Sequence, residues 1–306
     1  MRKFFTICII LSLFFTSMFM TNTHSTNNPT SLVGETFVYN VIASELNVTL
    51  KNQDYFVDSY QYEYQQFPAH TDISMEVTSV DDEDINYTQT VGETSFNTSY
   101  PYYPEFYEIF FVGILSHYFG LSYYIASGIS YDYNEFGNFS GSFFASGLAI
   151  YLSFFLPLND TVWESIEDAT IFYNNASNYS NNNFYHDLSA LQFTYNEIEG
   201  FIYIEGWYSG HLYARDAGDG DICTNLLLIY EKATGVLYGF HSKGCYDGKL
   251  FKNKIRVDYD LHVELADYDM PVLSLFTPLK VPNSVIIVPI GLVVCTIVYN
   301  KKKERN

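Results

Sequence analysis

The sequence predicts an α+β protein in which an antiparallel β-sheet packs on apolar helices from the middle of the chain, with one C-terminal transmembrane helix. Alternating strand patterns occupy 34–44, 72–92 and 188–265. Two uncharged runs, 109–130 and 138–159, separate them. The chain then ends in an apolar segment followed by a basic tail, which is the layout of a single membrane span.

Residues 1–25 have the layout of a secretory signal peptide. Arg2 and Lys3 precede an apolar run from Phe4 to Met20. The run is longer than usual and lacks a clear small-x-small cleavage site, so an uncleaved anchor is the alternative. In both cases the residues that follow are expected to be exported.

The first strands follow the signal peptide. The stretch GETFVYNVIAS (34–44) is rich in β-branched and aromatic residues, which predicts a strand. The stretch 72–92 places two alternating runs on either side of Asp81–Asp84, which predicts a β-hairpin. The four acidic residues could hold calcium, but we expect a solvated turn, the commoner role of such a cluster.

The two uncharged runs are each about as long as a membrane is thick. Both contain many Ser, Tyr and Gly residues, and His117 and Asn138 make them more polar than the C-terminal segment. We therefore expect two helices buried in the fold. A membrane hairpin with both flanks outside is the alternative.

A short amphipathic helix is expected to begin near Thr161. Thr161 and Glu164 have the spacing of a capping box. Val162, Ile166 and Ala169 fall on one helical face, so this face should pack on the core.

The C-terminal half of the exterior reads as a meander of antiparallel strands separated by turn residues. These strands are expected at 188–198, 200–214, 223–232, 235–244 and 254–265.

The third and fourth of these strands form the clearest hairpin, in which Gly235 supplies the positive φ of a type I turn with a G1 bulge. Cys223 and Cys245 are each eleven residues from Thr234, so they should nearly face each other. Because the pair is exported, it predicts a disulfide rather than a metal site.

The end of the chain predicts a membrane anchor. Residues 285–299 carry no charge, and a helix over 281–300 reaches the roughly 20 residues needed to span a bilayer. The basic tail 301–306 marks the cytoplasmic side. We therefore expect a single-pass cell-membrane protein whose residues 26–280 form one extracellular α+β domain.

The charge of the exterior limits its partners. Residues 26–300 hold nine of the 15 basic residues and 34 of the 35 acidic ones, a net charge of about −25. Such a field repels nucleic acid and attracts cations and basic partners. The expected partners are the membrane, through 281–300, and an extracellular protein, glycan or lipid ligand.

Sequons agree with an exported glycoprotein, since each Asn-x-Ser/Thr triplet without proline is a glycan acceptor on an exposed surface. They begin at Asn47, Asn86, Asn97, Asn138, Asn159, Asn175 and Asn178.

One loop could hold a metal ion. Asp216, Asp219 and Asp221 surround two glycines, and carboxylate oxygens on a flexible loop suit Ca²⁺. The spacing is not that of an EF-hand, and Gly and Asp are also ordinary turn residues. No other cofactor is expected, because the histidines are scattered without zinc-binding spacing.

Three motifs, VGETFVYNV, LPLNDTVWESI and YEKATGVLYGFH, resemble those of a loose group of uncharacterised archaeal exported surface proteins with C-terminal anchors. The resemblance implies a curved antiparallel sheet folded around helices, similar to the half-barrel of bacterial lipoprotein carriers. It implies no catalytic residues.

Aromatic residues are in excess, with 29 Tyr and 26 Phe. Most should fill the core, but Tyr and Trp also stack on sugars and fill interfaces. The first hypothesis is a recognition or adhesion module that uses its outer face, and binding is favoured over catalysis. The second is a carrier that encloses an apolar ligand on the concave side of the sheet. The third is a carboxylate-dependent glycan hydrolase.

Overall fold

The computed structural model describes residues 32–271, apart from 64, 138–142, 176–178, 181–183, 187–190 and 215–217. These residues form one large, mostly antiparallel sheet and two α-helices, which confirms the α+β class. The first strands are β1 (Thr36–Leu50), β2 (Gln53–Tyr62), β3 (Gln65–Pro68), β4 (Ile73–Val80), β5 (Asp84–Val91) and β6 (Thr94–Pro101). The middle contains α2 (Pro104–Phe136), the 3-10 turn η3 (Phe143–Ser146), β7 (Leu148–Ala149) and α3 (Asp160–Asn174). The last strands are β8 (Tyr179–Ser180), β9 (Phe184–His186), β10 (Gln192–Ile198), β11 (Phe201–Ala214), β12 (Gly218–Glu231), β13 (Leu237–Leu250) and β14 (Asn253–Leu265).

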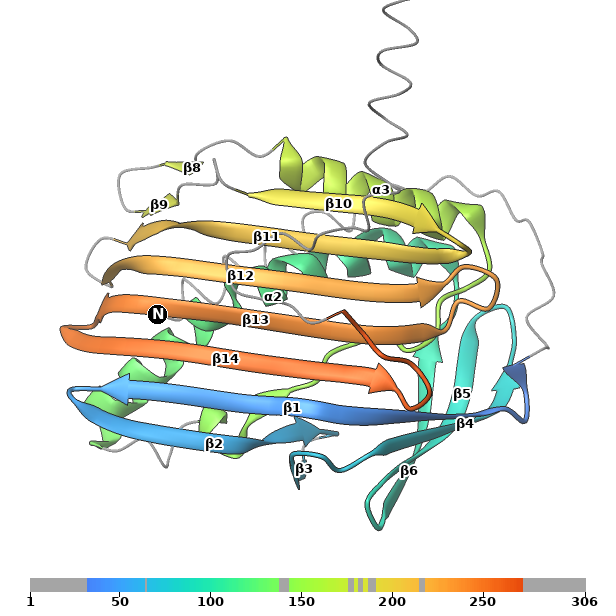
Figure 1. Cartoon of the computed structure of the whole chain (residues 1–306), viewed down its shortest axis with the longest axis horizontal. Coiled ribbons are helices and arrows are strands. Elements are labelled where there is room, and N and C mark those ends of the chain that lie inside the picture. The colour runs from blue at the N-terminus through green and yellow to red at the C-terminus, as the bar shows by residue number, and fades with distance from the viewer. Residues whose placement is uncertain are drawn as a thin grey trace, which may run out of the picture.

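The main path of the sheet runs β6-β5-β4-β1-β14-β13-β12-β11-β9-β8, with β10 also paired to β11 (Figure 1). The first strand therefore lies beside the last long one, from Tyr39 opposite Leu265 to Leu50 opposite Ile255. On its other side β1 pairs with β4 at its start and with β2 at its end. The sheet thus branches at β1. The pairing of β1 with β14 joins the two ends of the described chain in one domain.

Strand alternation gives the sheet an inner and an outer face. On β14 the odd-numbered residues from Ile255 to Val263 are buried, whereas Lys254, Arg256 and Asp258 are charged and more exposed. Because successive side chains point to opposite faces, the odd-numbered residues define the inner face. The predicted meander is confirmed in β10–β14, although β12 begins before Cys223 and includes residues expected in a loop.

The hairpin expected around Asp81–Asp84 is also confirmed, since β4 and β5 flank it. Oδ1 of Asp81 accepts hydrogen bonds from the backbone N–H groups of Glu83 and Asp84, at 2.9 and 2.8 Å. The acidic cluster therefore forms a turn in which one carboxylate caps the chain.

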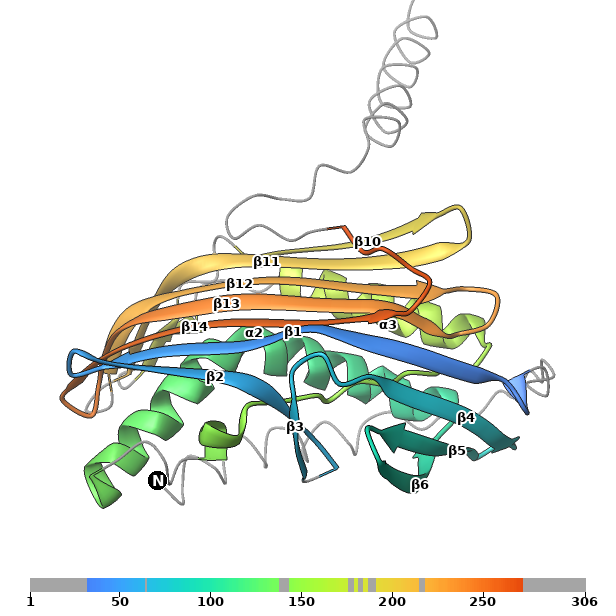
Figure 2. The same ribbon diagram turned by 60° about the horizontal axis from the view of Figure 1, so that its bottom comes forward.

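Helix α2 lies along the inner face of the sheet (Figure 2) and contains the first expected helix. Pro104 opens it and Gly137, with φ 76°, ends it, as suits proline at a first turn and glycine just past the last. The hydroxyl of Ser130 donates to the carbonyl of Leu250 at 2.7 Å, and that of Tyr259 to the carbonyl of Tyr118 at 3.2 Å. These bonds join α2 to strands far away in the sequence.

The prediction of a second helix over 138–159 is wrong. Residues 143–159 form η3, β7 and an irregular segment, and 138–142 lie outside the described residues. Gly147 has φ +102°, and a Cβ there would meet the carbonyl oxygen of Ser59 at 1.9 Å. The segment takes its backbone partners from other elements, such as Gly235 for the N–H of Leu156 and Gln61 for that of Ile150. An apolar run without helical period therefore packs as extended chain.

Helix α3 begins at Asp160, one residue before the expected start near Thr161. Asn159 is its N-cap and accepts a hydrogen bond from the backbone N–H of Thr161 at 2.9 Å, so the expected Thr161–Glu164 capping box is not the cap. Its expected core face is confirmed, because Val162 and Ile166 are fully buried.

The expected transmembrane helix at 281–300, the signal peptide at 1–25 and the tail at 301–306 lie outside the described residues. In the described part of the chain, one helix is long and apolar enough to cross a membrane. It is α2, in the middle of the chain, and 56% of its most apolar 18-residue stretch is buried inside the protein. The C-terminal span at 281–300 stays a prediction.

Candidate functional site

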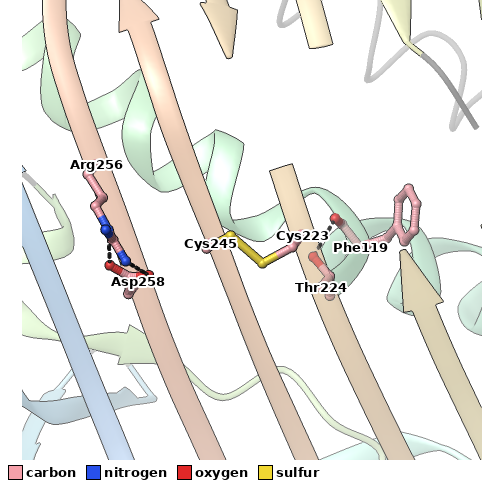
Figure 3. The surroundings of a disulfide bond; sticks show 6 residues. All are labelled: Phe119, Cys223, Thr224, Cys245, Arg256 and Asp258. Carbon is pink, nitrogen blue, oxygen red and sulfur yellow. Dashed lines mark hydrogen bonds and ion pairs between the residues drawn. A yellow bond between two sulfur atoms is a disulfide. The ribbon is translucent and has the colours of Figure 1, made fainter. Parts of the chain in front are cut away.

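The expected disulfide is confirmed. Cys223 on β12 and Cys245 on β13 lie directly opposite each other with Cα atoms 5.0 Å apart (Figure 3). The hairpin turn beyond them contains Gly235 at φ 71°, and the register shifts next to it, as a bulge requires. The bond lies on the outer face of the sheet and joins two neighbouring strands.

The expected calcium loop is partly replaced by strand. Asp219 and Asp221 lie on the outer face of β12, and both contact the exposed His211 of β11. Nε2 of His211 is 2.6 Å from Asp219, and Nδ1 is 2.9 Å from Asp221. The hydrogen bond with Asp221, and then the charge of both carboxylates, raises the pKa of His211 despite partial burial. The two carboxylates can therefore accept hydrogen bonds from both ring N–H groups of a protonated His211.

Asp216 lies outside the described residues. Within the described ranges, no group of three or more His, Cys, Asp or Glu side chains is arranged to hold a metal ion. Calcium binding at Asp216, Asp219 and Asp221 therefore stays a prediction.

Two histidines that are 21 positions apart in the sequence meet on the outer face. The rings of His241 and His262 stack with centroids 4.3 Å apart and planes 9° apart. Nε2 of His241 lies 2.8 Å from Asp260, and Nε2 of His262 lies 3.0 Å from Glu264. Lys243 adds an ion pair to Asp260 at 2.5 Å. Sequence spacing could not show this pair, because cross-strand register brings the two residues together.

This histidine cluster holds the chain that follows β14. The backbone N–H of Met270 donates to Oε2 of Glu264 at 3.1 Å, and the Met270 side chain packs on Leu227 and Ile229. Burial, together with the neighbouring His241, lowers the pKa of His262 to about 4. A neutral His262 therefore donates from Nε2 to Glu264. The cluster fixes a segment to the outer face, which is a structural role.

Five of the seven sequons lie in the described residues. Asn47, Asn97 and Asn175 are exposed, whereas Asn86 and Asn159 are half-buried. Asn138 and Asn178 lie outside the described residues.

A group of aromatic rings lies at the surface of the helical layer, on the side away from the sheet. Two rings flank His117 of α2: Tyr124, 42% exposed, and Tyr151, 51% exposed. The centroids of His117 and Tyr124 are 6.4 Å apart with nearly parallel planes, and those of His117 and Tyr151 are 5.5 Å apart. We call His117, Tyr124 and Tyr151 the aromatic platform.

Helix α2 and the buried Tyr118 position the residues of the platform. His117 and Tyr124 lie two turns apart on α2, so they share a face. The backbone N–H of Tyr151 donates to the hydroxyl of the fully buried Tyr118 at 3.1 Å, and that hydroxyl lies 3.2 Å from the Tyr151 carbonyl. Tyr118 in turn packs on Phe240 of the sheet. The buried Tyr118 therefore fixes the backbone of Tyr151 beside α2.

The surroundings of the platform differ from the rest of the surface. Neither 109–130 nor 138–159 contains Asp, Glu, Lys or Arg, although the whole chain has a net charge of −20. Large apolar side chains of the described residues are also exposed in this layer, at Tyr103, Ile109, Phe136, Ile171 and Phe172. The outer face of the sheet instead carries the ion pairs of His211, Lys243 and Arg256.

The inner face of the sheet is filled where α2 crosses it. Phe119 contacts Tyr208 with centroids 4.4 Å apart, and Tyr118 contacts Phe240 at 4.5 Å. All of these side chains are at most 8% exposed. An apolar ligand on this face would have to displace α2.

Carboxyl groups with a raised pKa are candidates for an acid catalyst. Among the described residues, burial raises the pKa of Glu108 on α2 and of Glu205 on β11. Glu108 belongs to the layer on the inner side of the sheet, whereas Glu205 lies on the outer face, opposite Leu227. The sheet thus separates these two groups.

Comparison with protein-family models, curated proteins and solved structures found no match for this chain. The resemblance to exported surface proteins therefore stays a prediction.

Proposed function

We propose that this chain is a membrane-anchored cell-surface binding or adhesion protein. In this proposal residues 26–280 lie outside the cell, 281–300 anchor them and 301–306 are cytoplasmic. The charge pattern of the two ends, the disulfide and the exposed sequons support export. The sheet that packs on α2 agrees in outline with a half-barrel-like, curved architecture.

The observation that carries a binding role is the aromatic platform. Exposed apolar rings that gather in one layer are typical of interaction sites. Tyr124 and Tyr151 each offer exposed apolar area, and their ring contacts with His117 lower the entropy that is lost on binding. The platform is thus suited to stack on a flat apolar surface such as a sugar ring or a partner's side chain.

The path of the chain favours this layer as the presented face. The described chain leaves the outer face of the sheet near Met270, and the proposed span begins about ten residues later. An extended segment of this length reaches at most about 35 Å. The proposed anchor would thus be attached on the outer-face side of the domain, opposite the platform.

The charge of the exterior restricts the ligand. A strongly acidic domain repels anionic glycans and nucleic acid. An uncharged aromatic surface in such a domain favours neutral glycans or neutral and basic protein surfaces. The carrier and hydrolase alternatives are less favoured, because α2 fills the inner face where it crosses and the sheet separates the two carboxyl groups with raised pKa.

The proposal can be tested with the full chain in detergent on an array of neutral hexose and N-acetylhexosamine oligosaccharides, and on intact cells. The variants are Tyr124→Ala and Tyr151→Ala. Phe172→Ala is the matched control, because Phe172 is 54% exposed on α3 but does not belong to the platform. If the platform is the main contact with the ligand, each platform variant should weaken binding about tenfold, whereas the control should not.

Equal binding by the wild type and both platform variants would contradict the platform. Failure of the wild type to bind both array and cells would contradict the binding role itself.

A further inference from the structure

An exposed phenylalanine lies next to a sequon on the outer face of the sheet. Phe56 on β2 is 59% exposed. Asn47 of β1, the first residue of the triplet Asn47-Val48-Thr49, is also exposed and lies directly opposite Phe56. The two strands are neighbours along this part of the sheet (Figure 1).

Their register decides what a modification at Asn47 would meet. Residues directly opposite each other on antiparallel strands point to the same face, with Cβ atoms about 5 Å apart. A sugar linked to Nδ2 of Asn47 would rise from the outer face beside the phenyl ring. One face of a pyranose ring consists mainly of C–H groups, so it can bury apolar area against an aromatic face.

Two carboxylates near Asn47 are engaged in interactions of their own. Across β14 it faces Asp258, whose carboxylate is paired with Arg256 at 2.8 Å. The hydroxyl of Thr49 donates to Asp54 at 2.6 Å. The carboxylates of Asp258 and Asp54 thus already have partners, and the phenyl ring is the apolar surface directly opposite Asn47.

A second exposed sequon provides the contrast. Asn97 on β6 lies directly opposite Thr88 of β5, whose hydroxyl donates to Oδ1 of Asn97 at 3.1 Å. No ring faces Asn97 in this register. A glycan at Asn97 would therefore extend from a polar strand surface without an aromatic ring opposite.

We infer that Asn47 carries an N-linked glycan whose first sugar packs on the ring of Phe56. The glycan covers an apolar side chain that the fold leaves exposed, and the contact stabilises the β1–β2 ladder. This inference rests on the proposed export, because only an exported chain meets the glycosylation machinery.

The test uses the full chain produced in a host that attaches N-glycans, with site occupancy read by peptide mass spectrometry. Thermal unfolding is then compared in a cycle of wild type, Asn47→Gln, Phe56→Thr and the double variant. We expect Asn47→Gln to lower Tm by about 3 °C when Phe56 is present, and by less than about 1 °C in the Phe56→Thr background. Trimming the glycan to its linking sugar should leave Tm within about 1 °C of the untrimmed protein, because the first sugar makes the contact.

The control is Asn97→Gln, whose shift in Tm should be the same with and without the Phe56 ring. An equal shift for Asn47→Gln with and without the ring would overturn the inference, as would an unoccupied Asn47 beside an occupied Asn97; in both cases export would still stand. Sequons that are all unoccupied would overturn the inference and remove the glycosylation part of the proposed function.

Discussion

Replacing Cys223 and Cys245 by alanine should destabilise the protein through its unfolded state. The bond joins residues 22 positions apart across the β12–β13 hairpin. In the folded protein the two strands pair along their length with or without the bond. The bond therefore acts mainly by restricting the unfolded chain, whose loop it closes.

The magnitude follows from the length of that loop. For 22 residues the chain-entropy relation gives about 3.4 kcal/mol at 25 °C. In a protein of this size each kcal/mol shifts Tm by roughly 2–4 °C. The double alanine variant should therefore unfold about 7–14 °C below the oxidised wild type.

Differential scanning calorimetry of the wild type with and without reductant, together with the double variant, measures this shift. The variant should be insensitive to reductant, and the reduced wild type should unfold near it. Alkylation before and after reduction reports whether the thiols are free. A reduced wild type that unfolds within about 1 °C of the oxidised protein would refute the reasoning, since the loop would then contribute nothing.

Three further predictions concern single side chains. The folded pKa of His262 is about 4, below that of free imidazole near 6.5, so its contribution to stability is fully present above pH 6.5 and is lost toward pH 4. Urea unfolding at pH 7 and at pH 4.5 measures this loss. Between the two pH values, the free energy of unfolding of His262→Gln should fall by about 1–2 kcal/mol less than that of the wild type. Gly235→Ala should cost about 3 kcal/mol in a urea titration, because φ is +71° and the new Cβ would meet the carbonyl oxygen of Leu156 at 2.1 Å. Gly200→Ala is its control and should cost only about 1 kcal/mol, since φ is +86° but no atom lies within 4 Å. Tyr107→Phe should cost about 1–2 kcal/mol in the same assay, because its hydroxyl lies 3.0 Å from the Pro101 carbonyl and from two oxygens in the core, those of the Ser153 hydroxyl and the Phe155 carbonyl. Unchanged midpoints would show that those bonds contribute nothing.

Where the strands and turns of this protein lie is determined mainly by residues close together in the sequence. Alternation along β14 and the turn around Gly235 are set by neighbouring residues, so period and turn chemistry predicted them. The same local logic placed Cys223 opposite Cys245, because both are counted from one turn. The amphipathic face of α3 also followed from its spacing.

The segment 143–157 shows where local information ends. It is apolar on all sides, so no period distinguishes a helix from an extended chain. Its backbone groups bond to Gln61 and to Gly235, which are distant in the sequence. The outcome depends on partners that exist only when β2 and the β12–β13 hairpin are in place.

The sequence by itself determined the α+β class, the long strands, the disulfide and the net negative charge, because these follow from period, turn residues and composition. Only the tertiary structure decided that β1 lies beside β14, that His241 stacks on His262, and that Tyr151 joins His117. Each of these contacts joins residues from different elements. Such contacts depend on strand order, register and packing, which no local pattern encodes.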